Sequence, residues 1–97
     1  NMTVINPADS IEAEQAVLKA AEIKGPVYIR LGRMAVEDVY DTDYKFQLGK
    51  GVELKKGNDL TIIATGIMVQ EALKAAKKLS EEDNHNSRKR DRSYCYC

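Results

Sequence analysis

Two short runs with strand-like alternation flank a helical stretch in the first third of the chain. The runs are residues 2–5 (MTVI) and 27–31 (VYIRL), and in the second one apolar residues alternate with a tyrosine and an arginine. Gly25 and Pro26 stand before the second run, where glycine suits the end of a helix and proline cannot continue one. A strand, a helix and a strand in this order predict two parallel strands with a right-handed crossover, which is a unit of an α/β fold.

The helical stretch is predicted to begin after Asp9 and to end at Gly25. Asp9 followed by Glu12 fits a capping box, in which the aspartate accepts from the first turn and the glutamate reaches back to the N–H of the cap. Small apolar residues recur at helical spacing and predict a narrow stripe against a sheet. The stripe consists of Ala13, Ala16, Val17, Ala20 and Ala21. We assign Asp9 the role of a helix cap only.

Composition excludes several classes of protein. The chain has 97 residues, of which 43% are hydrophobic, and a formal net charge of +0. This balance is typical of a small globular segment and gives no long-range field toward nucleic acid or a membrane surface. The longest apolar run, residues 60–69, is interrupted by Thr and Gly and is shorter than the roughly 20 residues of a membrane span. No signal segment opens the sequence, so we expect a cytoplasmic location.

The middle of the chain changes pattern twice. Residues 34–48 mix acidic, valine and aromatic residues without a period, and we interpret them as a linker whose aromatic residues pack locally. Two short strands follow at residues 52–54 and 60–64, and they predict a hairpin around a turn rich in Lys, Gly and Asn. A second helix is predicted from Thr65 or Gly66 with one apolar face. That face consists of Val69, Ala72, Leu73, Ala76 and Leu79.

The last segment, residues 81–97, has no apolar periodicity. Its polar residues cannot bury enough surface to offset the entropy of ordering, roughly 1 to 2 kcal/mol per residue for the backbone, so we expect a disordered tail. The basic run 87–92 is a candidate contact for nucleic acid or an acidic partner, although such runs are more often simply solvated. Cys95, Cys97 and His85 are candidate metal ligands, but their spacing differs from that of a zinc site, and reduced thiols are the simpler interpretation.

The order of these segments resembles the C-terminal section of a transketolase, most closely the small subunit of split-chain transketolases. The matching segments are NMTVINPADSIEAEQAVLKAA, GPVYIRLGR and GKGVELKKGNDLTIIATGIMVQEALKAAKKL. The resemblance runs to about Leu79, and the tail after it reads as an unrelated or frameshifted end. It implies that residues 1–33 end a pyrimidine-binding domain, that 34–48 are a linker and that 49–80 start a C-terminal domain. The chain is then a piece of a larger α/β protein.

The resemblance also implies a chemistry. Transketolases use thiamine diphosphate and a divalent metal to move a two-carbon ketol unit between phosphorylated sugars, and the family's cofactor motifs have no counterpart in this sequence. We therefore expect no catalytic, cofactor-binding or metal-binding residue in this chain and no activity from it alone. The expected partners are the remaining transketolase domains or a large subunit, together with further copies of the chain in a homo-oligomer.

One site residue carries over from the resemblance. Arg33 closes the segment GPVYIRLGR, and the arginine at this place in the family binds the phosphate of the sugar substrate. Its position is compatible with that role, because ligands of α/β folds gather at the carboxyl ends of strands and a guanidinium suits two phosphate oxygens. An arginine at a strand end is otherwise more often a surface ion-pair partner. Arg30 is assigned a structural role.

A second class of function remains open from the residues themselves. A chain with few strands and two helices leaves sheet edges and apolar faces uncovered. Such a chain can act as a small interaction module that self-associates and holds an acidic partner with its basic tail. Binding assays with sugar phosphates and with nucleic acid separate this function from that of a transketolase section.

Overall fold

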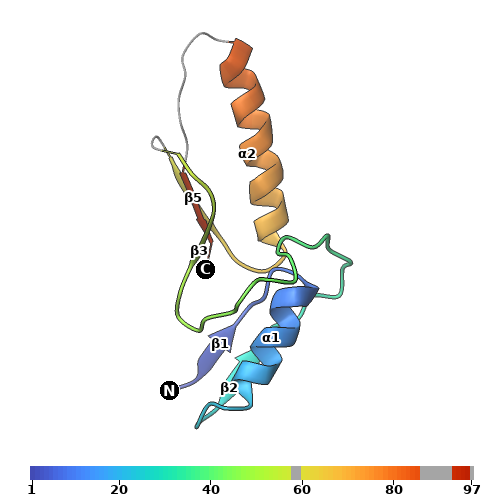
Figure 1. Cartoon of the computed structure of the whole chain (residues 1–97), viewed down its shortest axis with the longest axis vertical. Coiled ribbons are helices and arrows are strands. Elements are labelled where there is room, and N and C mark those ends of the chain that lie inside the picture. Colours follow the sequence, from blue (N-terminus) through green and yellow to red (C-terminus); the bar gives the residue numbers. More distant parts are fainter. Residues whose placement is uncertain (58–59, 86–92, 97) are drawn as a thin grey trace.

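The computed structural model describes residues 1–57, 60–85 and 93–96 (Figure 1). Its elements, in chain order, are β1 (Thr3–Ile5), α1 (Ser10–Ala20), β2 (Val27–Ile29), β3 (Val52–Lys55), β4 (Thr61–Ala64), α2 (Met68–His85) and β5 (Ser93–Tyr96). They form two units that follow one another along the long axis of a molecule of 52 × 26 × 24 Å. The fold class is α/β, as predicted.

The first unit consists of β1, α1 and β2. The two strands lie side by side and parallel, with Thr3 opposite Val27 and Ile5 opposite Ile29, which confirms the predicted pairing. β2 ends two residues earlier than predicted, although the N–H of Arg30 still donates to the carbonyl of Ile5 at 2.9 Å. The carboxyl ends of both strands therefore lie together, beside the segment that leads into the linker.

α1 begins at Ser10 because the carboxylate of Asp9 caps it. Asp9 Oδ1 accepts from the N–H of Glu12 at 2.8 Å. Glu12 reaches back as a capping box requires, but its Oε2 accepts from the N–H of Ala8 at 2.7 Å and not from that of Asp9. The glutamate therefore ties the helix to the residue before its cap, one position earlier than predicted.

α1 ends before Gly25, the residue at which the sequence predicted its end. The helix ends at Ala20. After it, the backbone forms hydrogen bonds between residues three positions apart, as in a 3₁₀ turn, and the N–H of Ile23 donates to the carbonyl of Ala20 at 3.1 Å. Gly25, with a φ of +128°, lies in the turn that leads into β2. Of the predicted apolar stripe, Ala16 is fully buried, whereas Val17 is 47% exposed. A sheet of two strands is too narrow to cover the whole stripe.

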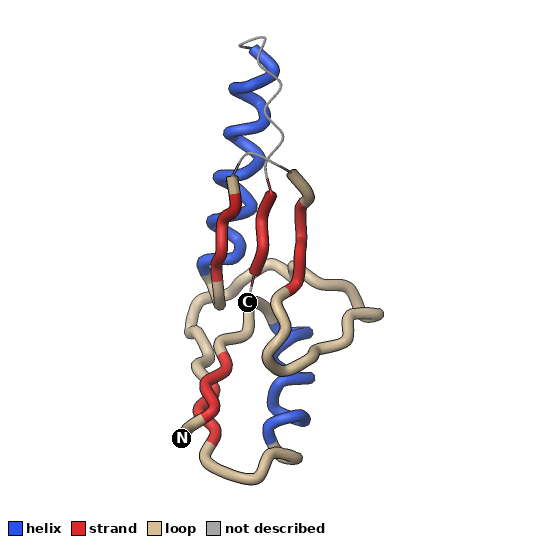
Figure 2. The backbone as a smooth tube through the Cα atoms, turned by 90° about the vertical axis from the view of Figure 1, so that its left-hand side faces the viewer, coloured by secondary structure: helices blue, strands red, loops and turns tan. Residues whose placement is uncertain are grey.

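The predicted hairpin of β3 and β4 is wrong. β5 lies between them, antiparallel to β3 and parallel to β4, as Figure 2 shows. The turn residues between β3 and β4 describe only the local backbone. Which strands pair in a sheet depends on the whole fold and cannot be decided from such residues alone. The sequence SYCY of β5 contains two tyrosines, which favour strands, and its insertion gives both β3 and β4 a backbone partner.

The expected disordered tail also needs correction in its described parts. α2 continues to His85, well past the point where we expected regular structure to end, and Ser93–Tyr96 form β5. The helical extension is plausible because glutamate is a good helix former. The basic run 87–92 and Cys97 lie outside the described residues, so the interpretations given for them remain untested.

The main core lies along the inner face of α2. The helix begins at Met68, slightly later than predicted. Val69, Ala72 and Ala76 are buried, which confirms the predicted apolar face. Ala8 of the first unit is buried in the same cluster. The partly buried residues packed against the cluster come from the linker and the second unit, and they are Val39, Tyr40, Leu54, Ile62, Ala64 and Leu73. The two units therefore share one core.

A junction of three residues, Asn6, Thr65 and Gly66, joins the end of β1 to the start of α2. The N–H of Gly66 donates to the Asn6 carbonyl at 3.1 Å, and Asn6 Nδ2 donates to Thr65 Oγ1 at 3.0 Å. Gly66 is buried and has a φ of +57°. A Cβ at this position would lie 2.6 Å from Asn6 Oδ1, so both the backbone conformation and the available space favour glycine.

Candidate functional site

Arg33 lies in a bend after β2, at the carboxyl ends of the two parallel strands. Its side chain is exposed and makes no hydrogen bond or ion pair with another described residue. The guanidinium is therefore available to an external anion. Arg30 contributes to the structure through its backbone bond to Ile5, while its side chain is exposed.

The segment after Arg33 is fastened to α1 by a polar stripe, which consists of Asp9, Glu12 and Gln15. Asp9 is 4% exposed. While Asp9 Oδ1 caps the helix, Asp9 Oδ2 accepts from the N–H of Val39 at 2.7 Å and from that of Tyr40 at 2.8 Å. Asp9 is thus more than a cap: one buried carboxylate satisfies backbone donors of both the helix and the linker.

The other two residues of the polar stripe hold the second half of the linker. Gln15 Nε2 donates to the Tyr44 carbonyl at 2.7 Å, and Gln15 Oε1 accepts from the N–H of Phe46 at 2.7 Å. The Tyr44 hydroxyl donates to Glu12 Oε1 at 2.9 Å. The rings of Tyr40 and Tyr44 stack with centroids 3.9 Å apart, so the linker aromatic residues do pack locally.

Two further bonds hold the linker between the units. Ser10 Oγ donates to Asp38 Oδ1 at 2.8 Å, and Gln70 Nε2 of α2 donates to the carbonyl of Glu37. The segment that carries Arg33 is consequently fixed by β1 on one side and by α1 and α2 on the other. A short, tethered segment of this kind holds an exposed side chain near the strand ends.

The Tyr44 hydroxyl, which donates to Glu12 of the polar stripe, has a strongly perturbed environment. Burial, followed by the hydrogen bond to Glu12 and the negative charge of that carboxylate, raises the pKa of the Tyr44 hydroxyl well above its usual range. Because this pKa is higher in the folded chain than in the unfolded chain, its contribution to stability is complete below pH about 10. The contribution is lost as the pH rises through the folded-state pKa.

We expect the Tyr44→Phe substitution to remove the part of the pH dependence of stability that comes from ionisation of the Tyr44 hydroxyl. At neutral pH it should lower the unfolding free energy by about 1.5 kcal/mol, because it deletes a hydrogen bond to a carboxylate. In an alkaline titration followed by tyrosinate absorbance, the late step of the parent chain should be missing. Tyr28→Phe is the control, because it leaves the bond between Tyr44 and Glu12 intact and should retain the step. A late step that survives in Tyr44→Phe would show that another tyrosine is responsible.

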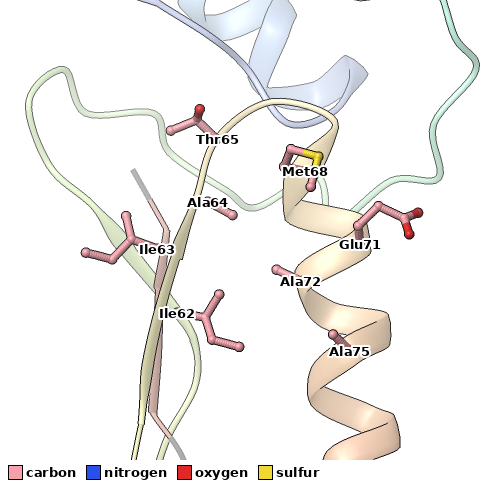
Figure 3. A pocket seen from close by; sticks show the side chains of 8 residues that line it. All are labelled: Ile62, Ile63, Ala64, Thr65, Met68, Glu71, Ala72 and Ala75. Carbon is pink, nitrogen blue, oxygen red and sulfur yellow. The ribbon is translucent and has the colours of Figure 1, made fainter.

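An apolar cleft of about 600 Å³ lies between β4 and the first turns of α2. In Figure 3 Ile62 and Ala64 point toward α2, whereas Ile63 points to the opposite side of the strand. Ile63 is 66% exposed and Met68 is 59% exposed. The lining residues are Ile62, Ile63, Ala64, Thr65, Met68, Glu71, Ala72 and Ala75. With one carboxylate and one hydroxyl at its margin, the cleft suits an apolar surface better than a charged ligand.

The described residues offer no donor set for a metal and no helix long and apolar enough to cross a membrane. Within residues 1–57, 60–85 and 93–96, no group of three or more His, Cys, Asp or Glu side chains is placed to hold a metal ion. Neither α1 nor α2 meets the requirements of a membrane span. The site that the structure does present is an exposed guanidinium on a tethered segment.

These features define a class: an α/β chain with a parallel strand–helix–strand unit and a second α/β unit. Residues 49–86 match the family model described as the C-terminal domain of transketolase. A solved structure described as a split-gene transketolase in an inactive β4 tetramer has a TM-score of 0.87 and 46% sequence identity to this chain. The match covers 99% of this chain and 30% of that one.

Curated relatives give the same result. The chain is 46% identical over 79 residues to the 6-deoxy-6-sulfo-D-fructose transketolase subunit SqwH of Clostridium sp. (strain MSTE9), which covers 81% of this chain and 24% of that protein. It is 42% identical over 82 residues to a subunit of apulose-4-phosphate transketolase from Phocaeicola vulgatus, covering 84% of this chain and 26% of that protein. This chain spans about a quarter of the length of these relatives. It corresponds to a C-terminal section of transketolase-family proteins, which confirms the resemblance.

The matches also extend the resemblance along the chain. We expected it to end near Leu79, but the family match continues to residue 86, which includes the last turns of α2. The linker contacts of Asp9, Gln15 and Gln70 were not predicted. Their partners lie about thirty positions away along the chain, and nothing in the local sequence indicates such a distant pairing.

Proposed function

We propose that this chain contributes the sugar-phosphate contact of a transketolase-type enzyme, with Arg33 as the phosphate-binding residue. The observation that carries the proposal is the exposed guanidinium of Arg33, which pairs with no other described residue and follows the carboxyl ends of two parallel strands. A free phosphate group there can receive two parallel N–H donors from the guanidinium. The tethers to α1 and α2 restrict the segment, which lowers the entropy that binding has to overcome.

Two-carbon transfer needs parts that this chain does not supply. Within its described residues, no group of three or more His, Cys, Asp or Glu side chains is placed to hold a metal ion, and we derive no step through thiamine diphosphate or its divalent metal. We propose that the remaining transketolase domains or a large subunit hold the cofactor, that the assembly is cytoplasmic, and that the isolated chain is inactive. Activity that appears only after a large subunit is added would support this division of roles.

Phosphate titration followed by amide NMR tests Arg33 directly. We expect saturable shifts at Gly32 and Arg33 with an affinity in the millimolar range or weaker, because a few charge-assisted contacts, each about 1.5 to 3 kcal/mol, must offset desolvation of the anion. Arg33→Ala should abolish the shifts, and Arg33→Lys should restore little, because an ammonium does not reproduce the guanidinium fork.

Arg30→Ala is the matched control, since Arg30 is an exposed arginine three positions earlier and should leave the titration unchanged. If the amides of Gly32 and Arg33 stay still while others shift, the assignment of Arg33 is wrong. An equal loss in Arg30→Ala and Arg33→Ala would indicate non-specific attraction of the anion to positive charge.

The exposed apolar surface favours a second candidate function, self-association. Large hydrophobic residues are more than half exposed on both units. Among the described residues they are Met2, Val4, Leu18, Tyr28, Leu31, Met34, Ile63 and Met68. We interpret these side chains as part of a surface that another chain covers, because large exposed apolar patches mark interaction sites. We propose that copies of this chain associate with one another, with the dimer as the smallest assembly.

A further inference from the structure

The second sheet contains a slot that is one strand wide. Its walls are the facing backbone edges of β3 and β4, and β5 fills it. Against β4 the register is continuous over four pairs, from Thr61 opposite Ser93 to Ala64 opposite Tyr96. Against β3 the pairing is antiparallel, with Glu53 opposite Cys95 and an irregularity between Glu53 and Lys55. The slot therefore fixes both the direction and the position of the strand that it accepts.

The slot and its strand come from different parts of the chain. β3 and β4 lie inside residues 49–86, which match the transketolase C-terminal domain, whereas β5 lies beyond that match. Between the end of α2 at His85 and the start of β5 at Ser93 stand seven residues, 86–92. β5 is held by its backbone pairing with β3 and β4. An extended segment of another chain can bind a sheet edge through the same backbone hydrogen bonds.

The face of β4 that points away from α2 is open to solvent. Ile63 lies on this face, as Figure 3 shows, and it is 66% exposed. A second copy that enters the slot would bring its own sheet or helix near this side chain. In the closed form β5 occupies the slot of its own chain, and in the exchanged form it occupies the slot of a second copy. The backbone pairing is the same in both forms, so exchange replaces each hydrogen bond with the equivalent one from the other chain.

We propose that the slot between β3 and β4 is a strand-binding site that accepts Ser93–Tyr96 of a second copy of the chain as well as those of its own. The occupant is β5, because its direction and register in the slot are those seen within one chain. The inference specifies a route for the self-association proposed above and rests on it, and it is independent of phosphate binding at Arg33.

A disulfide first tests the register within one chain. In the double variant Glu53→Cys/Cys97→Ser, the introduced thiol stands opposite Cys95 across an antiparallel pair. Directly opposite positions lie about 4.5 to 5.5 Å apart between Cα atoms, within the range of a disulfide. At low concentration under a mild oxidant we expect an intrachain bond. Failure to form it would overturn the register and with it the proposal.

Two chains with one thiol each then test exchange. The acceptor is an isotope-labelled Glu53→Cys/Cys95→Ser/Cys97→Ser chain, and the donor is a Cys97→Ser chain that keeps Cys95. Neither chain can close a disulfide on itself, so a mixed disulfide forms only between the two chains, and its yield is raised above that of random collision if the donor's β5 lies beside the acceptor's β3. A short tether gives an effective concentration on the order of millimolar, so we mix the chains at about 1 mM each.

The control acceptor carries Glu14→Cys in place of Glu53→Cys, because Glu14 is exposed on α1, in the other unit. By mass spectrometry we expect about tenfold more mixed dimer with Glu53→Cys than with Glu14→Cys, in line with a specific tethered site. Equal yields would overturn strand exchange. Light scattering on the parent chain then separates the two failures: a dimer leaves self-association standing by another route, and a monomer removes both.

Discussion

Replacing Asp9 with alanine is expected to lower the unfolding free energy by roughly 3 to 5 kcal/mol, since it removes a helix cap and leaves two linker N–H groups without their acceptor. The carboxylate accepts from Glu12, Val39 and Tyr40 at 2.7 to 2.8 Å. Small domains are stable by only about 5 to 15 kcal/mol, so much of the folding equilibrium depends on this one residue. Urea unfolding followed by circular dichroism measures the loss.

Asp9→Asn separates the two roles of the carboxylate. Asparagine is as good a helix cap as aspartate, but it offers one acceptor oxygen where the structure uses both oxygens. We therefore expect a loss between those of the parent chain and Asp9→Ala. Glu14→Ala, on the exposed face of the same helix, should be nearly neutral. If Asp9→Asn were as stable as the parent chain, the linker bonds of Asp9 would contribute little.

Replacing Gly66 with alanine is expected to lower the unfolding free energy by about 2 to 3 kcal/mol. A left-handed backbone conformation is unfavourable for alanine by about 1 to 2 kcal/mol, and Gly66 has a φ of +57°. The added Cβ would also lie 2.6 Å from Asn6 Oδ1, which forces the amide away from Thr65 and loses a bond of about 1 kcal/mol. The same denaturant titration measures the effect.

Two companion variants assign this cost to its causes. Gly49 has a φ of +77° with no atom near its missing Cβ, so Gly49→Ala reports the backbone cost alone. Asn6→Ala removes the amide that a Cβ at position 66 would strike, and the double variant should lose less than the sum of the single losses. Equal losses of unfolding free energy in Gly49→Ala and Gly66→Ala would show that the Asn6 side chain moves away from the added Cβ without a loss of stability.

The first unit was predictable because its signals are local. Asp9 caps a helix a few residues away, and Gly25 with Pro26 separates that helix from β2, so the parallel pair followed from connection rules. The end of α1 was less predictable. Hydrogen bonds between residues three positions apart end the helix after Ala20, before Gly25. The position of this end depends on the path of the turn that leads into β2.

The second unit and the site depended on distant pairs. The turn between β3 and β4 carries hairpin residues, yet the sheet order places β5 between them, because a third strand competed for the same backbone edges. The position of Arg33 after a strand was predictable from the sequence, but only the structure shows that its side chain is exposed and pairs with none of the residues it describes. Likewise, Asp9 was recognised as a cap from its neighbours, while its bonds to Val39 and Tyr40 join residues about thirty positions apart.

The burial of Ala8 beside α2 bears on the order in which a ribosome releases this chain. Ala8 packs in one cluster with Val69, Ala72 and Ala76, and Asn6 bonds to Thr65 at a separation of 59 positions. The cap of α1 can form almost as soon as it is synthesised, and the linker can attach after about thirty more residues. Ala8 must then stay uncovered until the first turns of α2 have emerged. Contacts between such distant residues form late and slowly, so Ala8 of the nascent first unit is exposed to solvent until Val69, Ala72 and Ala76 can pack against it.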